Sequence, residues 1–90
     1  MKLKFLLTEG TCPKYIPGDI EGPTASEELY AVDVSKEECI DICKRARREN
    51  AEVVGATISV TGGRCYCEMN GNQVKPNFDY LTCYLPTNGV

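Results

Sequence analysis

Histidine and tryptophan are both absent from the 90 residues of this chain. Without histidine, a serine or cysteine nucleophile lacks its usual general base, and a zinc site lacks one of its common ligands. The carboxylates that are present are explained by helix capping, loops and solvated faces, and no spacing singles out a catalytic pair. The sequence therefore predicts that the protein is not an enzyme and has no cofactor.

Long apolar runs are absent too. No stretch approaches the roughly 20 residues that a transmembrane helix requires, and no N-x-S/T acceptor for N-glycosylation occurs. The net charge of −3, from 10 Lys+Arg and 13 Asp+Glu, argues against a general nucleic-acid-binding protein. We therefore expect neither a membrane span nor a nucleic-acid partner.

The N-terminal residues 1–7, MKLKFLL, begin with basic charge, but their apolar part is too short for the core of a secretion signal. Their alternation of apolar residues with lysines also fits a strand. We assign residues 1–9 to an N-terminal strand or the start of a mature chain. Residues 10–86 are expected to form one domain, and residues 87–90 a C-terminal tail.

Cysteine is abundant, with six residues at positions 12, 39, 43, 65, 67 and 83. An even number in so short a chain is typical of an extracellular domain held by disulfides, because a core of this size needs covalent support. An intracellular zinc site on the four central cysteines is the alternative, but it leaves Cys12 and Cys83 unexplained. We expect three disulfides and no metal.

The clearest predicted element is a helix that begins near Lys36. Ser35 and Glu38 form the S-x-x-E pattern of a capping box. Acidic residues fall early in this segment and basic residues late, as the helix dipole favours, and Asn50 can adopt the left-handed conformation that ends a helix. At 100° per residue one face is apolar and carries two cysteines, with the members Cys39, Ile42, Cys43 and Ala46.

Strands are predicted after this helix. Residues 53–60 are rich in β-branched side chains, a Thr-Gly-Gly turn follows, and residues 64–69 alternate as the returning strand. Residues 70–79 contain strong turn signals and are expected to form a loop. Residues 80–85 are expected to form the final strand.

Before the helix, residues 11–16 and 29–32 are candidates for short strands, and residues 17–28 are expected to form an exposed acidic loop between them. One helix among several short strands predicts an α+β domain with a mostly antiparallel sheet.

The spacing of the central cysteines restricts how they can pair. Cys39 and Cys43 lie about 6 Å apart on one helix face, and Cys65 and Cys67 about 6.6 Å apart on one strand face. Neither close pair can bond within itself without distortion. Each helix cysteine is therefore expected to bond one strand cysteine, in a parallel or a crossed arrangement between which local geometry does not choose. The two end cysteines are then left to bond each other.

The stretch ECIDICKRARRENAEVVGATISVTGGRCYCE, flanked by Cys12 and by YLTCYL, resembles the PAN/apple domain family over residues 10–85. In that family a central helix with C-x₃-C packs on a curved antiparallel sheet. The close C-x-C pair is spaced more tightly here than in many members. The resemblance implies a nested pairing, with bridges Cys12–Cys83, Cys39–Cys67 and Cys43–Cys65.

The resemblance also implies a function at the level of class. Family members are non-catalytic extracellular binding units of clotting proteases, growth factors, parasite adhesins and leech antihaemostatic proteins. We therefore expect a monomeric, adhesion-type unit, secreted or on the extracellular side of a surface protein, that binds a protein or a carbohydrate. A small secreted inhibitor or effector on the same scaffold is the alternative.

A basic cluster near the end of the helix is the first candidate site, for a sulfated glycosaminoglycan, with the members Lys44, Arg45, Arg47 and Arg48. Arginine suits bidentate contacts to sulfate and carboxylate groups. The alternative is purely structural, because cations stabilise a helix C-terminus and Asp41 can pair with Lys44 and Arg45.

The loop at residues 70–79 and the residue after it form the second candidate site. Amide and charged side chains suit sugar hydroxyls and aromatic rings can stack on a sugar face, and the residues concerned are Asn72, Gln73, Lys75, Asn77, Phe78 and Tyr80. An ordinary solvated connection is the alternative.

Tyr66 and Tyr84 are each offset by one residue from a cysteine, so they are expected to face away from the helix. They form either an apolar patch for a protein partner or a packing surface for the N-terminal segment.

Overall fold

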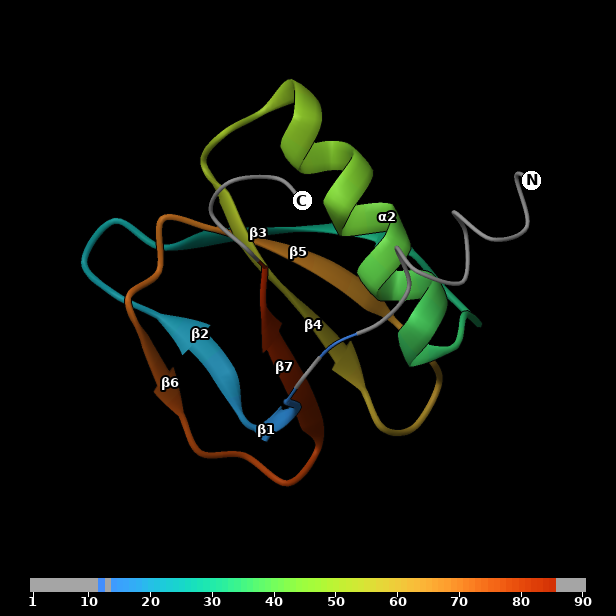
Figure 1. The fold of residues 1–90 in the computed structure, drawn as a ribbon. Coiled ribbons are helices and arrows are strands. Elements are labelled where there is room, and N and C mark those ends of the chain that lie inside the picture. The colour runs from blue at the N-terminus through green and yellow to red at the C-terminus, as the bar shows by residue number, and fades with distance from the viewer. Residues whose placement is uncertain (1–11, 13, 86–90) are drawn as a thin grey trace.

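The structure is a computed structural model that describes residue 12 and residues 14–85. One helix packs on a five-stranded antiparallel sheet, and a two-stranded sheet lies beside it (Figure 1). The α+β class expected from the sequence is therefore confirmed. The expected N-terminal strand and C-terminal tail lie outside the described residues. In chain order the elements are β1 (Ile16–Pro17), β2 (Asp19–Glu21), β3 (Ser26–Ala31), α2 (Lys36–Glu49), β4 (Val53–Ser59), β5 (Cys65–Met69), β6 (Gln73–Lys75) and β7 (Tyr80–Tyr84).

The helix α2 begins where the capping box predicts. The Glu38 amide donates to the Ser35 hydroxyl at 3.1 Å, and the Ser35 amide donates to the Glu38 carboxylate at 2.8 Å. These two bonds satisfy backbone donors that have no partner inside the helix. At the other end Asn50 is extended, with φ −137°, so the expected left-handed conformation is wrong. Its side chain accepts from the Glu52 amide at 3.0 Å and so turns the chain toward β4.

The buried face of α2 is slightly rotated from the predicted one. Cys39, Ile40 and Cys43 are buried, whereas Ile42 and Ala46 are only partly buried at the margin of the core. The core beneath consists of apolar side chains from β4, β5 and β7 and the segment after them, namely Val53, Ala56, Ile58, Cys65, Cys67, Met69, Cys83 and Leu85. Disulfide sulfur thus makes up a large part of a small core, as expected for a chain of this length.

The main sheet has the strand order β1-β7-β4-β5-β3, and all of its pairs are antiparallel. The segment after α2 reverses the chain into β4, and the β4–β5 hairpin reverses it again. Two reversals make α2 and β5 run in the same direction. This relation between a helix and a strand decides which cysteines can meet.

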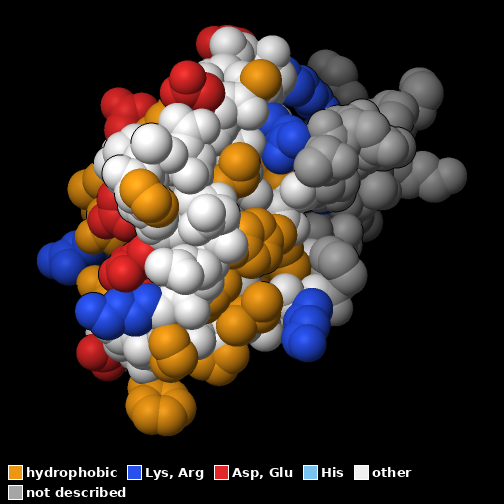
Figure 2. Space-filling model, turned by 90° about the vertical axis from the view of Figure 1, so that its left-hand side faces the viewer, with side chains coloured by type: hydrophobic (Ala, Val, Ile, Leu, Met, Phe, Trp, Pro, Cys, Tyr) orange, Lys and Arg blue, Asp and Glu red, His pale blue; other side chains and the backbone are white. Residues whose placement is uncertain are grey.

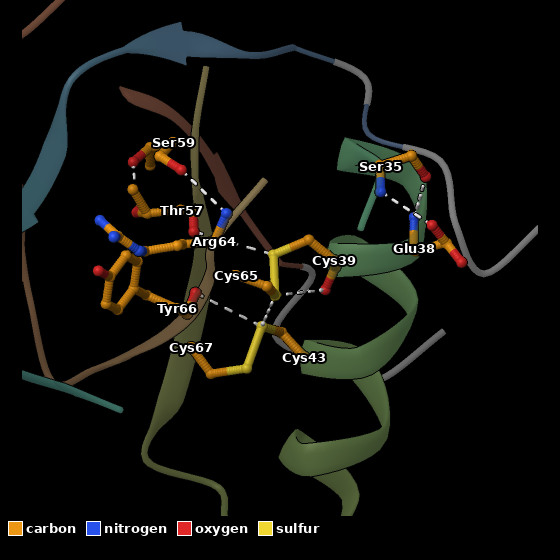
Figure 3. The surroundings of a disulfide bond; sticks show 11 residues. Ser35, Glu38, Cys39, Cys43, Thr57, Ser59, Arg64, Cys65, Tyr66 and Cys67 are labelled. Atoms are coloured by element: carbon orange, nitrogen blue, oxygen red, sulfur yellow. Dashed lines mark hydrogen bonds between the residues drawn. A yellow bond between two sulfur atoms is a disulfide. The ribbon is translucent and has the colours of Figure 1, made fainter. Parts of the chain in front are cut away.

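Three disulfides are present, and the bridge between the ends of the domain, Cys12–Cys83, is as expected. The nested inner pairing implied by the family resemblance is wrong. Cys39 bonds Cys65 and Cys43 bonds Cys67, with Cα–Cα distances of 5.3 and 5.4 Å (Figure 3). The physical reason is the shared direction of α2 and β5, which places the first cysteine of one beside the first cysteine of the other.

A second sheet joins two segments that the sequence predicts to be loops. β2 and β6 pair antiparallel, with Ile20 opposite Val74, and β3 begins three residues before the predicted strand. Ile20 is buried, and a Cβ atom at Gly55 or Gly71 would collide with its side chain. The absence of side chains at these glycines lets the small sheet pack on the face of the main sheet opposite the helix.

Candidate functional site

The basic cluster of α2 makes contacts within the protein. Arg45 forms an ion pair with Asp41 at 2.8 Å, and the Arg47 guanidinium donates to the Val53 carbonyl at 3.1 Å. The ion pair is one that the structural alternative predicts, whereas the bond from Arg47 to Val53 is an additional contact. An exposed ion pair between residues four apart on a helix is worth only about 0.3–0.5 kcal/mol. The cluster can therefore still exchange these contacts for an anionic ligand, and its glycosaminoglycan role stays a prediction.

The residues of the predicted sugar site do not form one surface. Gln73 and Lys75 lie on β6, and Gln73 lines a cavity beside β2, whereas Tyr80 opens β7. The backbone amide of Asn72 donates to the Glu21 carbonyl at 3.0 Å, so this residue extends the pairing of β2 and β6 by one hydrogen bond.

Asn77 and Phe78 form a tight turn of their own. The Asn77 side-chain oxygen accepts from the Asp79 amide at 2.8 Å, and Phe78 between them is 92% exposed. A large apolar ring held in solvent by a local hydrogen bond gains nothing from burial in its own domain. Phe78 is therefore the loop residue that most needs a functional explanation.

An apolar row crosses the sheet face opposite the helix. Leu29 on β3 stands opposite Tyr66 on β5 in register, and the rings of Tyr66 and Tyr80 meet edge to face with centroids 6.4 Å apart. Leu29 is 53% exposed, and both tyrosines are partly exposed. The ring that contacts Tyr66 is thus that of Tyr80, a pairing that the sequence did not predict.

The turn that carries Phe78 joins this row directly before Tyr80, and the Val60 amide anchors it by donating to the Asp79 carbonyl at 2.9 Å. The Val60 side chain lines a cavity with Ser35 and Ile58 on the helix side of the sheet. We therefore define the apolar face as Leu29, Tyr66, Phe78 and Tyr80.

The side of the molecule that carries β2 and β6 is seen in Figure 2. Apolar side chains gather in its central and lower parts, acidic side chains lie along its upper margin, and acidic and basic side chains alternate along its left-hand margin.

A carboxylate cavity beside β2 is the feature that the sequence did not reveal. Its volume is about 570 Å³, and it is lined by residues of β2, β3, β5 and β6. One carboxylate oxygen from each of Asp19, Glu27 and Glu68 lies within 4.8 Å of the other two. The signal that could have found it is the alternation of β5, because Glu68 must face away from the helix-facing Cys67, into the layer between the two sheets.

Glu68 has an unusual environment. Its side chain is 1% exposed. Burial, with the neighbouring Asp19 as the next cause, raises the pKa of its carboxyl group to about 10. At neutral pH and without a bound cation the group is therefore a neutral acid.

The sulfur atoms of Cys39, Cys43 and Cys65 also lie within 4.8 Å of one another. Zinc binds cysteine as the thiolate, and sulfur in a disulfide carries no such charge. These atoms serve as a covalent link between α2 and β5.

Three disulfides indicate an oxidising environment. Within the described residues, α2 is too short and too polar to cross a membrane.

Comparison with known proteins yields no relative: no family model matches the chain, and no curated protein and no solved structure matches it significantly.

Proposed function

We propose that this domain is a non-catalytic extracellular binding module that recognises a protein through its apolar face. The observation that carries the proposal is the exposure of Phe78, at 92%, at the end of a row of partly exposed apolar side chains. Monomeric soluble proteins rarely leave such side chains together in solvent unless a partner covers them. The resemblance to PAN/apple domains, which are extracellular binding units, supports the same class.

The charges around the apolar face indicate the chemistry of the partner. Glu27 lies on the same strand and face as Leu29, Asp79 follows Phe78, and Asp33 bonds the hairpin that begins after Val60. Arg64 is a cation at the same end of the sheet. The acidic side chains outnumber this arginine, so we expect the partner's surface to be an apolar patch with a cationic rim.

A binding screen against purified extracellular proteins tests the proposal. The parent domain is compared with Phe78→Asp and Leu29→Asp, which place charge on the apolar face, and with Glu52→Lys, at an exposed position outside every candidate site, as the matched control. Loss of a central apolar anchor costs about 2 kcal/mol or more, which is roughly a 30-fold loss of affinity. We expect this loss for both face variants and no loss for the control.

Two results would contradict protein recognition by this face. One is a set of protein ligands whose affinity is unaffected by both face variants. The other is a dimer of the parent domain that Phe78→Asp dissociates, because the apolar face would then be buried by a second copy.

Carbohydrate binding is the second candidate, because the Asn77 turn presents an aromatic ring beside polar groups, as sugar stacking requires. A glycan array with the parent domain and Phe78→Ala tests it, and signals that disappear in the variant are expected. Retention on a heparin column that is lost in Arg45→Glu/Arg48→Glu would instead assign the ligand to the basic cluster of α2.

A further inference from the structure

The carboxylate cavity is formed by side chains from strands that are distant in sequence. Asp19 comes from β2, Glu27 from β3 and Glu68 from β5, and the cavity is also lined by Glu21, Ser26 and Gln73. None of these lining residues is a lysine or an arginine. Lys75 stands opposite Asp19 in the β2–β6 register and is exposed, so it is the nearest cation in the pairing.

Two buried oxygen atoms in this cavity lack a hydrogen-bond partner, namely Oδ1 of Asp19 and Oε2 of Glu68. A buried polar atom without a partner costs free energy, and for a charged group the cost is larger. A side chain as fully buried as Glu68, with an unsatisfied oxygen in an acidic cavity, therefore calls for a positively charged or proton-donating occupant.

The Thr57 hydroxyl has two competing acceptors. The Thr82 hydroxyl donates its proton to the Gly18 carbonyl at 2.8 Å, and so it accepts from the Thr57 hydroxyl at 2.6 Å. Thr57 also neighbours Glu68, where a hydrogen bond from its hydroxyl lowers the pKa of the carboxyl group. A threonine has a single hydroxyl proton, so Thr57 cannot serve Thr82 and Glu68 at once.

A proton and a metal ion are the two occupants that can satisfy these oxygens. A proton on Glu68 suits the raised pKa of its carboxyl group and allows one hydrogen bond, from the Glu68 carboxyl group to the Asp19 carboxylate. A divalent cation can contact all three carboxylates at once. Oxygen atoms within 4.8 Å of one another can surround an ion at the 2.3–2.6 Å distances that calcium prefers.

We propose that this cavity is a calcium site in which Asp19, Glu27 and Glu68 supply carboxylate ligands. Calcium suits it better than magnesium, because the ligands come from strands of two different sheets and magnesium demands a near-ideal octahedron. Ser26 and Gln73 line the cavity and carry further oxygen atoms of the kind that complete a calcium shell. Extracellular modules bind calcium with dissociation constants of about 0.1–1 mM, which is the range we expect.

The experiment measures the melting temperature of the intact, oxidised protein against CaCl₂ at pH 8, after removal of metal with a chelator. NaCl at matched ionic strength controls for screening, and MgCl₂ tests selectivity. Glu68→Gln keeps the shape of the side chain and removes its charge, and Glu27→Gln does the same at an exposed position that the fold tolerates. Glu52→Gln, at an exposed position outside the cavity, is the matched control.

We expect calcium to raise the melting temperature of the parent and of Glu52→Gln, with half-saturation at about 0.1–1 mM. The response should be lost in Glu68→Gln and weakened roughly tenfold or more in Glu27→Gln, because the ligand charge falls. A parent that does not respond at pH 8 would overturn the calcium site and leave the proton as the occupant. An equal response in all variants would overturn it as well, by placing calcium elsewhere.

Discussion

The Sγ atom of Cys43 lies 3.9 Å from the Sγ atom of Cys65, although each of them is bonded to a different cysteine. The two inner disulfides are thus packed against each other between α2 and β5 (Figure 3). The short diagonal distance belongs to one of the bonds of the nested pairing. Exchange into this one bond therefore requires only a small movement of its two sulfur atoms, and experiment can separate the two pairings.

Paired cysteine removal distinguishes the two arrangements. Cys39→Ser/Cys65→Ser removes one actual bridge and leaves Cys43–Cys67 intact, at a cost of about 3–4 kcal/mol for a loop of this length. Cys39→Ser/Cys67→Ser leaves Cys43 and Cys65, which can bond across their 3.9 Å separation only after both side chains move. We expect no free thiol in either variant and a higher melting temperature in the first. The reverse order of melting temperatures would favour the nested pairing.

A single cysteine variant should exchange its bridges. In Cys39→Ser the freed Cys65 thiolate can attack the Sγ atom of Cys43, forming Cys43–Cys65, breaking Cys43–Cys67 and releasing the Cys67 thiolate. Alkylation after long incubation at pH 8 is therefore expected to label both Cys65 and Cys67. When acid stops the exchange at an early time, the label should be found mainly on Cys65, the free cysteine of the isomer that retains Cys43–Cys67. Peptide fragmentation locates the label. Label on Cys65 alone after every incubation time would show that the exchange does not occur.

The stability of the metal-free protein should depend on the ionisation of Glu68. The folded state holds this proton up to a pKa of about 10, whereas the unfolded chain loses it near the ordinary value of 4.5. The contribution of Glu68 to stability is therefore full below pH 4.5 and declines as the pH rises toward 10, with a limiting slope of about 1.4 kcal/mol per pH unit.

Urea unfolding of the parent and of Glu68→Gln in a chelating buffer, at several pH values, measures this contribution. Glutamine cannot ionise, so we expect the variant to lose less stability than the parent between pH 5 and pH 9, whereas Glu52→Gln should follow the parent. Identical pH profiles for the parent and Glu68→Gln would contradict the raised pKa.

The packing of the small sheet on the main sheet depends on glycine at position 55. A Cβ atom there would collide with Cδ1 of Ile20 and would lie 3.0 Å from the Cys83 carbonyl oxygen, so Gly55→Ala is expected to cost about 1–3 kcal/mol, the usual range for overpacking. Ile20→Val removes Cδ1 and should restore part of the loss. At Gly71 the collision is with Cγ2 of Ile20, which valine retains, so the same valine should not rescue Gly71→Ala. Thermal unfolding of the single and double variants gives the comparison, and rescue of both glycine variants, or of neither, would contradict this geometry.

The elements that the sequence predicted well are those with local signals. The capping box of Ser35 and Glu38 places the start of α2, and the β-branched run and the glycine turn place β4 and β5. β2 and β6 were missed because each has three residues, two of them charged or polar, and their pairing joins residues more than fifty positions apart. Such strands are defined by their partner rather than by their own composition.

The candidate sites were predicted less well, for a related reason. Phe78 and Tyr80 were identified as aromatic residues of a loop, but the row that Tyr80 forms with Tyr66 depends on strand register. The carboxylate cavity joins residues 19, 27 and 68, which only the tertiary structure brings together. The cysteine pairing likewise depends on the direction of a strand relative to the helix, and direction follows from topology rather than spacing.

The alternation of side chains along β5 has a consequence for how this protein can diverge in sequence. Cys65 and Cys67 face the helix, whereas Tyr66 and Glu68 face the opposite layer. Insertion or deletion of one residue inside β5 would exchange these faces, turning the sulfur atoms toward the small sheet and the glutamate toward the helix. Length variation among descendants of this chain should therefore be confined to the turns on either side, at residues 60–64 and 70–72, while the five positions of β5 change only by substitution.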